Sequence, residues 1–251
     1  MGKKIAIYGA GTIGACQATL TSGKGYSTVV IGHSEEGLSR CRNTMLQNWN
    51  DLIAQKLATA ANRRAAMDLV TITNDVSALR DCDIVFEAVS EDVNIKQRVY
   101  SIITEVCGRD IIVVSTTSSI DAAILAEKIE NPARFLIAHP FQPVHMLPLV
   151  EVVRHTETSE ETLNQVCTLL KDLNRQVVML NRSVPGFLVN RFAQALFRES
   201  IYLIEQGITT AADIDRAIKY AVGMRYASIG LLEYYDAVGF ELERAIALNV
   251  Y

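Results

Sequence analysis

The stretch that decides the fold is Lys4-Ile5-Ala6-Ile7-Tyr8-Gly9-Ala10-Gly11-Thr12-Ile13-Gly14. Its first five residues predict a short buried strand, and the residues after Gly14 predict a helix. The glycines between them have the spacing G-x-G-x-x-G, in which the first permits a tight turn, the second lets a pyrophosphate approach the backbone and the third lets helix and strand pack closely. The phosphates would lie at the helix N-terminus, where backbone N–H groups attract anions. The residues predicted to bind a dinucleotide are therefore Gly9, Gly11, Thr12, Ile13 and Gly14.

The second strand, Thr28–Ile31, bears on which dinucleotide is bound. A site selective for NAD carries an acidic residue at the end of this strand, where it binds the ribose 2′-hydroxyl. Here Gly32-His33-Ser34 follows, so no carboxylate repels a 2′-phosphate, and these side chains with Arg40 or Arg42 offer hydrogen-bond donors. The next residues, Glu35-Glu36, provide an alternative acidic partner. The sequence thus predicts NAD(P) as cofactor, with NADP favoured over NAD.

Further strands alternate with helical stretches along the chain. Strands are predicted at Leu69–Ile72, Ile84–Val89, Ile111–Val114 and Gln176–Leu180, and helices at Glu36 to about Ala61, Ser159–Leu173, Asp213–Val222 and Leu231–Leu248. This alternation predicts an α/β fold with a doubly wound, mostly parallel Rossmann-type sheet. The break in the pattern around Pro185 predicts a dinucleotide-binding domain at residues 1–184 and a smaller all-α domain at residues 185–251.

A stiff loop between two predicted strands is a second candidate site. Residues 134–153 contain two apolar runs, and the prolines between them each fix φ and remove a backbone donor. His139 closes the first run and Glu151 lies within the second, so neighbouring strands can bring an imidazole and a carboxylate together as a base and its orienting partner. A histidine at a strand end is more often structural, however, so this pattern alone does not establish catalysis.

Two more predicted strand ends carry polar residues at the carboxyl edge of the sheet, where doubly wound folds bind ligands. The first is Glu91 with Lys96, and the second is Ser115–Ser119. Ser118 or Ser119 is also suitably placed to cap the alanine-rich helix that follows Asp121. Substrate contact and helix capping are both open for this cluster.

The composition argues against several classes of partner. The net charge is −4, and the absence of a Lys/Arg run argues against nucleic acid or an anionic membrane surface as partner. The five cysteines have no C-x-x-C spacing, which is typical of reduced thiols in a cytoplasmic protein, and we predict no metal site. No apolar run approaches the ~18 residues that span a bilayer. A small molecule is the expected ligand.

Taken together, the motifs resemble the L-3-hydroxyacyl-CoA dehydrogenase family over nearly the whole chain. The matching segments are Gly9–Gly14, Glu87–Glu91 with Lys96, Ser115–Ser119, His139–Phe141, Leu149–Val152 and Pro185–Arg191. The resemblance implies that His139 is the general acid/base for a substrate 3-hydroxyl and that Glu151 orients it. It further implies that Ser118 hydrogen-bonds the reacting oxygen and that Asn190, from the helical domain, completes the catalytic site.

The same resemblance assigns Glu91 and Lys96 to the nicotinamide end of the cofactor. One departure stands close to the catalytic histidine. The family usually has asparagine at the position of Gln142, so a polar contact to the substrate or to His139 is expected to be re-aimed by the longer side chain. Gln142 is accordingly a candidate substrate-binding residue.

A second resemblance concerns the substrate. Residues His145–Glu151 and Gly223–Glu233 are similar to the branch that contains lambda-crystallin, L-gulonate dehydrogenase and carnitine dehydrogenase, whose enzymes act on small hydroxy acids. Arg225 is then a candidate to pair with a free carboxylate, with a surface role as the alternative.

Three functions follow from the two resemblances: oxidation of a 3-hydroxyacyl-CoA in fatty acid metabolism, oxidation of a small hydroxy acid, or a non-catalytic crystallin-like binding role. Both branches usually carry more helix beyond the position of Tyr251, so the helical domain is expected to be incomplete. Apolar faces after Phe187 would suit a homodimer.

Overall fold

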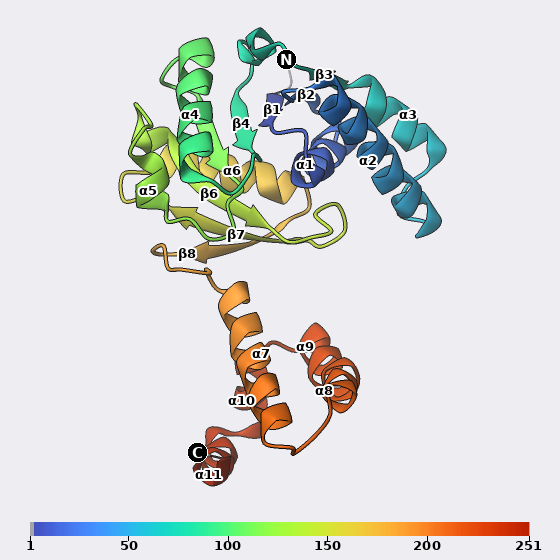
Figure 1. Ribbon diagram of the computed structural model, residues 1–251, viewed down its shortest axis with the longest axis vertical. Helices are drawn as coiled ribbons and strands as arrows, with labels where there is room; N and C mark the ends of the chain where they lie inside the picture. The colour runs from blue at the N-terminus through green and yellow to red at the C-terminus, as the bar shows by residue number, and fades with distance from the viewer. Residues whose placement is uncertain (1–2, 251) are drawn as a thin grey trace. The chain divides into compact units, whose positions relative to one another are not determined.

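The computed structural model describes residues 3–250, which fall into two compact units, Met1–Leu188 and Val189–Tyr251. The first unit, shown in Figure 1, is built on an eight-stranded sheet of order β3-β2-β1-β4-β5-β6-β7-β8. Its strands are β1 (Lys4–Tyr8), β2 (Ser27–Ile31), β3 (Val70–Thr73), β4 (Ile84–Glu87), β5 (Ile112–Ser115), β6 (Phe135–Pro140), β7 (Leu149–Arg154) and β8 (Gln176–Leu180). Neighbours from β3 to β6 pair in parallel, whereas β7 is antiparallel to β6. The predicted doubly wound, mostly parallel sheet is confirmed.

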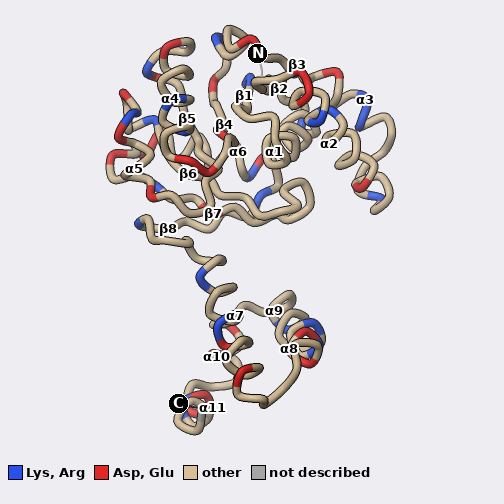
Figure 2. The backbone as a smooth tube through the Cα atoms, in the orientation of Figure 1, with Lys and Arg blue, Asp and Glu red and all other residues tan. Residues whose placement is uncertain are grey.

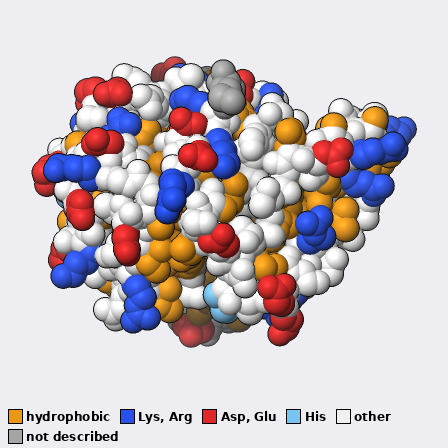
Figure 3. Space-filling view, turned by 90° about the horizontal axis from the view of Figure 1, so that it is seen from above, with side chains coloured by type: hydrophobic (Ala, Val, Ile, Leu, Met, Phe, Trp, Pro, Cys, Tyr) orange, Lys and Arg blue, Asp and Glu red, His pale blue; other side chains and the backbone are white. Residues whose placement is uncertain are grey.

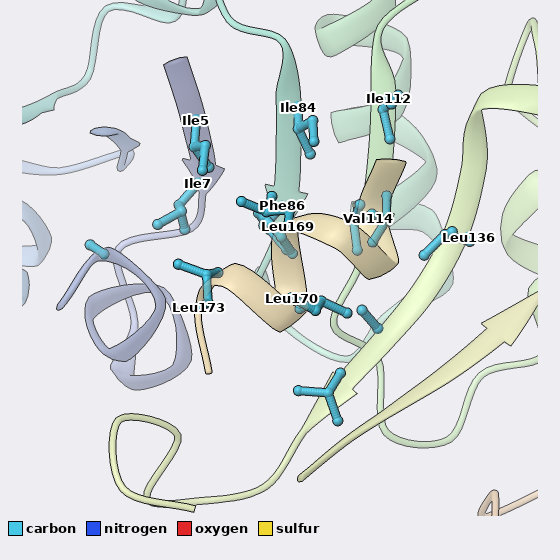
Figure 4. Packing of buried hydrophobic residues seen from close by; sticks show 14 of the residues in the cluster. Ile5, Ile7, Ile84, Phe86, Ile112, Val114, Leu136, Leu169, Leu170 and Leu173 are labelled. Carbon is cyan, nitrogen blue, oxygen red and sulfur yellow. The ribbon is translucent and has the colours of Figure 1, made fainter. Parts of the chain in front are cut away.

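Helices cover both faces of this sheet because the buried strands carry apolar side chains on each face. The helices are α1 (Thr12–Gly23), α2 (Glu35–Ala54), α3 (Ala60–Asp68), α4 (Val93–Cys107), α5 (Ala122–Ala126) and α6 (Glu160–Asp172). On one face, Ile5, Ile7, Phe86 and Val114 pack with residues of α1, α2 and α6. Figure 4 shows strand residues of this cluster beside Leu169 and Leu170 of α6. On the other face, alternate strand residues pack with α4 and α5. The core is therefore a three-layer α/β/α arrangement that leaves the strand ends available for a site.

The single helix predicted from residue 36 to about residue 61 is wrong. Helix α2 ends at Ala54, and Lys56 adopts a left-handed conformation with φ of 58°. Helix α3 then begins with a capping box, in which Thr59 and Asn62 each accept a hydrogen bond from the other's backbone N–H. The interruption was missed because left-handed positions after a helix are usually glycine, and here the residue is lysine.

The second unit consists of helices alone within its described part. They are α7 (Val189–Glu205), α8 (Ala211–Ala217), a π-helical turn (Ile218–Val222), α9 (Gly223–Ser228), α10 (Leu231–Val238) and α11 (Phe240–Val250). The predicted helix Leu231–Leu248 is interrupted at Gly239, whose φ is 96°. No residue of α7, α8, α9 or α10 is buried. These amphipathic helices therefore present apolar side chains, including Phe192, Phe197 and Leu232, to solvent.

Charged side chains of both signs are spread over the chain (Figure 2), and on the face shown in Figure 3 basic and acidic groups are interspersed around apolar ones. None of the helices in residues 3–250 is long and apolar enough to cross a membrane. With charges mixed in this way, attraction of a charged ligand depends on local groups at its site.

Candidate active site

A cavity of about 900 Å³ lies at the carboxyl ends of β1, β2 and β4. Five of the predicted cofactor residues line it: Gly9, Gly11, Thr12, Gly32 and His33. Ile13 and Gly14 belong to the first turn of α1 instead. A cavity at this edge of a doubly wound sheet is the usual position of a dinucleotide.

The three glycines of the loop have different geometric roles. A Cβ atom on Gly9 would lie 2.3 Å from the carbonyl oxygen of Ala88, and one on Gly14 would lie 1.8 Å from the carbonyl oxygen of Gly9. A Cβ on Gly11 would meet nothing within 4 Å. Gly9 and Gly14 are thus required by packing, whereas Gly11 leaves open space at the N-terminus of α1. This arrangement fits a pyrophosphate bound at the helix end.

The end of β2 is tightly packed at Gly32. A Cβ on this residue would lie 2.6 Å from Leu38 Cδ2 and 2.8 Å from Ala10 Cβ, so an acidic side chain does not fit without movement of its neighbours. His33 is exposed beside it. The Ser34 hydroxyl accepts a hydrogen bond from the backbone N–H of Gly37 and so caps α2.

Two arginines also line this cavity. Arg40 on α2 is ion-paired with Glu36 one turn earlier, and Arg98 projects from α4. Arg98 was not predicted, because in sequence it is indistinguishable from an ordinary arginine on the exposed face of a helix. Arg40 and Arg98 thus bring positive charge to the wall of the cavity.

The strands β6 and β7 place His139 directly opposite Glu151. The imidazole Nδ1 lies 2.9 Å from Glu151 Oε2, and both residues are buried. The second carboxylate oxygen accepts a hydrogen bond of 2.8 Å from the Leu188 backbone N–H. The rings of Phe141 and Phe187 lie against the imidazole, with centroids 4.6 and 5.6 Å away. A carboxylate that accepts from Nδ1 makes Nε2 the nitrogen that exchanges a proton with a ligand.

Ser118 is brought together with Glu91 at the ends of β5 and β4. Glu91 Oε1 accepts hydrogen bonds from the backbone N–H and hydroxyl groups of both Ser118 and Ser119, and from the Thr117 hydroxyl. Burial raises the pKa of Glu91, but the Thr117 hydrogen bond and the Lys96 charge outweigh it and hold that pKa below its ordinary value.

The alternative prediction for this cluster, that Ser118 or Ser119 caps the next helix, is wrong. Helix α5 is capped by Asp121, whose carboxylate accepts a hydrogen bond of 2.8 Å from the Ala123 backbone N–H. The hydroxyls of the two serines bind the Glu91 carboxylate instead. The available signal for this cap was Asp121 itself, an acidic residue directly before the alanines of the helix.

Lys96 lies beneath this group rather than on the cavity wall. Its side chain is only 1% exposed, and its ammonium lies 2.8 Å from Glu87 Oε1 and 3.3 Å from Glu91 Oε2. Glu87 was not predicted to have a role of its own. The available signal was its position as a charged residue ending an otherwise apolar strand.

The remaining predicted residues lie on the loop after β6 and in the second unit. Gln142 is exposed in the loop between β6 and β7. Asn190, in the first turn of α7, and Arg225, on α9, belong to the second unit. The guanidinium of Arg225 stacks on the ring of Tyr234, 4.4 Å from its centroid.

Comparison with known proteins places the chain among dehydrogenases. Residues 4–183 match the model for "3-hydroxyacyl-CoA dehydrogenase, NAD binding domain", and residues 186–251 match the corresponding C-terminal domain. An L-carnitine dehydrogenase of Bacillus cereus is 32% identical over 229 residues, covering 91% of this chain and 69% of that protein. A 3-hydroxybutyryl-CoA dehydrogenase of Clostridioides difficile is 29% identical over 98% of this chain and 86% of its own length.

A solved structure agrees with these matches. It is 5-formyl-3-hydroxy-2-methylpyridine 4-carboxylic acid 5-dehydrogenase, described as an NAD+-dependent dismutase, with a TM-score of 0.90 and 30% identity over all of this chain and 81% of that one. The similarity extends over both compact units.

Proposed function

Because the chain belongs to the 3-hydroxyacyl-CoA dehydrogenase family, we propose that it interconverts a 3-hydroxyacyl compound and its 3-keto form, using NAD(P). The observation that carries this proposal is the His139–Glu151 pair, 2.9 Å apart at the carboxyl end of β6. The glycine loop after β1 lies at the same edge of the sheet. A proton-transfer group and a dinucleotide site thus share one edge, as oxidation of an alcohol requires.

In the proposed mechanism, His139 Nε2 accepts the proton of the substrate 3-hydroxyl. Glu151 accepts a hydrogen bond from Nδ1, which fixes the tautomer and stabilises the imidazolium that forms. The Ser118 hydroxyl hydrogen-bonds the reacting oxygen, and Phe141 and Phe187 limit the access of water to the imidazole. The nicotinamide cofactor, when bound, supplies the hydride acceptor. Asn190 is proposed to complete the site.

The proposal is tested by replacing the histidine while leaving cofactor binding intact. His139→Gln is expected to lower kcat by about 10²- to 10⁴-fold, the usual contribution of a general acid/base, with little change in NADH affinity. His155→Gln, on the chain just after β7, is the matched control and should retain activity. Wild-type turnover by His139→Gln would contradict the mechanism.

The cofactor preference is a further part of the proposal. Gly32 has no room for the acidic side chain that selects NAD, and Arg40 and Arg98 line the cavity beside His33, so we propose that NADP is preferred. Arg40→Gln should then weaken NADPH more than NADH. Arg42→Gln, which alters an exposed arginine outside the cavity lining, is the control. Tighter binding of NADH than NADPH by the wild-type protein would refute this preference.

The substrate is proposed to be a 3-hydroxyacyl-CoA or a related 3-hydroxy acid. Similarity to a 3-hydroxybutyryl-CoA dehydrogenase supports a thioester, whereas similarity to L-carnitine dehydrogenases supports a small free acid. Turnover of 3-hydroxybutyryl-CoA, L-carnitine and 3-hydroxybutyrate, each with both cofactors, distinguishes these alternatives. Loss of activity in Arg225→Gln only with the free acids would support pairing of Arg225 with a carboxylate.

We further propose that the protein forms a homodimer through the second unit. Helices α7 to α10 contain no buried residue and expose Phe192, Phe197 and Leu232, so a partner surface would bury apolar area. Sedimentation equilibrium tests this proposal directly. A monomer across the micromolar range would contradict it.

A further inference from the structure

A fully paired ionic cluster lies beneath the ends of β4 and β5. Glu87 Oε1 accepts hydrogen bonds from Lys96 Nζ at 2.8 Å and from the Val89 backbone N–H at 2.9 Å. Glu87 Oε2 accepts from the hydroxyls of Tyr100 and Ser115, both at 2.8 Å. Glu87, Tyr100 and Ser115 are fully buried, and Lys96 is 1% exposed. Four donors, from α4, from β5 and from the turn after β4, therefore surround this carboxylate.

The cluster is connected to the proposed nicotinamide end of the site. Lys96 Nζ lies 3.3 Å from Glu91 Oε2, and the other oxygen of Glu91 accepts from Ser118 and Ser119. Contacts thus run from Glu87 through Lys96 to Glu91 and on to Ser118. Glu87 itself lies outside the cavity lining, so it influences a ligand through the groups that it contacts, among them Lys96.

Stability alone is a weak reason for this arrangement. A buried ion pair loses the hydration of both charges, and well-packed apolar residues of similar volume are often equally stabilising. A fully satisfied polar network does, however, hold its members in one geometry. Here the held member is Lys96, which pairs with one oxygen of Glu91 while Thr117, Ser118 and Ser119 donate to the other.

We propose that Glu87 is a positioning residue that holds Lys96 beneath Glu91 and thereby fixes the Glu91–Ser118 arrangement against the cofactor and the reacting oxygen. This inference rests on the proposed function. With Glu87 and Lys96 compensating each other, Glu91 leaves one net negative charge at this end of the site. That charge favours the cationic oxidised nicotinamide over the neutral reduced one. Removal of the Glu87 charge should therefore weaken NAD(P)+ binding relative to NAD(P)H.

The test replaces Glu87 by glutamine, which keeps its shape and removes its charge. Glu87→Gln is expected to lower kcat/KM on the order of 10²-fold, as a small misplacement of reacting groups does. It should also raise the ratio of the NAD(P)+ to the NAD(P)H dissociation constant several-fold. Tyr100→Phe removes one hydrogen bond to the opposite carboxylate oxygen but no charge, and it should keep kcat/KM within a few-fold of wild type.

A second variant separates positioning from simple charge compensation. If Glu87→Gln folds poorly because Lys96 loses its fully buried partner, Glu87→Gln with Lys96→Met removes both charges and should restore the melting temperature. Positioning predicts that this folded double variant still has low kcat/KM. Wild-type kcat/KM in either variant, or a wild-type ratio of the two cofactor dissociation constants in Glu87→Gln alone, would overturn the inference. By contrast, a wild-type protein that binds neither nicotinamide cofactor would overturn the proposed function itself.

Discussion

Alanine in place of Gly14 should reduce stability, whereas alanine in place of Gly11 should reduce cofactor affinity. In Gly14→Ala the new Cβ would lie 1.8 Å from the Gly9 carbonyl oxygen, whereas non-bonded heavy atoms rest about 3.5 Å apart. The Gly9 backbone has little freedom to retreat, because its N–H donates to Ile31 O at 2.9 Å and its own Cα faces Ala88. Helix α1 must move instead, at the expense of packing against β1. Overpacking of this kind costs about 1–3 kcal/mol of the free energy of unfolding.

In Gly11→Ala the same methyl meets nothing within 4 Å, and the residue has an extended conformation with φ of −80°. The free energy of unfolding should therefore stay within about 0.5 kcal/mol of wild type. The methyl would occupy the space through which a pyrophosphate approaches the backbone. Loss of one hydrogen bond to a charged oxygen is worth about 1.5–3 kcal/mol, which is roughly a 10- to 150-fold rise in the dissociation constant.

Urea unfolding measures the first quantity, and a fluorescence titration with NADH or NADPH measures the second. Gly14→Ala should lose stability, and Gly11→Ala should lose affinity while remaining as stable as the wild type. Wild-type affinity in Gly11→Ala would refute the placement of the phosphates over this residue. Wild-type stability in Gly14→Ala would refute the packing argument.

Three smaller changes test other parts of the first unit. Burial holds the pKa of His145 below its ordinary value, so below about pH 6.5 the unfolded chain binds more protons than the folded protein does. The free energy of unfolding therefore falls as the pH is lowered. His145→Gln should flatten this pH dependence, measured by urea unfolding. Lys56→Gly should stabilise the protein by about 1 kcal/mol, because glycine adopts a φ of 58° without steric penalty, and lower stability would contradict that account. The hydrogen bond from Tyr26 to Asp172 raises the pKa of the Tyr26 phenol to about 12, so Asp172→Asn should bring that pKa back toward 10. Ultraviolet difference titration, with Tyr26→Phe as the control that identifies the Tyr26 signal, measures the change. An unchanged titration would exclude this hydrogen bond as the cause.

The α/β sheet was predictable because its signals are local. The strand β1, the glycine turn and α1 follow one another within Lys4–Gly23, and each strand of the parallel sheet is a short apolar run separated from the next by a helix. The break between α2 and α3 was not predictable in the same way. It depends on a lysine in a left-handed conformation, and on a cap formed by Thr59 with Asn62, where a glutamate or glutamine would be the familiar partner.

The candidate site was predictable in its residues more than in their contacts. Lys96 is nine positions from Glu87, on the helix that follows the strand, and no helical or strand periodicity relates the two. Which direction the Lys96 side chain takes depends on whether the strand end offers a buried anion. The anion is Glu87, and it meets Lys96 only because α4 packs on β4 and β5. The Lys96 side chain is therefore buried against Glu87, and its contact with the cofactor stays a prediction from the family resemblance.

The pairing of His139 with Glu151 depends on the one antiparallel neighbour relation of β6. Directly opposite residues of an antiparallel pair project to the same face of the sheet, and successive residues alternate between faces. A register shift of one residue would turn Glu151 into the apolar cluster that holds Val150 and Val152, leaving a buried carboxylate without the imidazole. The packing of Val150 and Val152 on one face of β7, and of Val153 on the other, therefore selects the register that also brings the two polar groups together. Folding and the proposed proton transfer thus impose the same requirement on this hairpin, so variants that shift its register should lose stability and activity together.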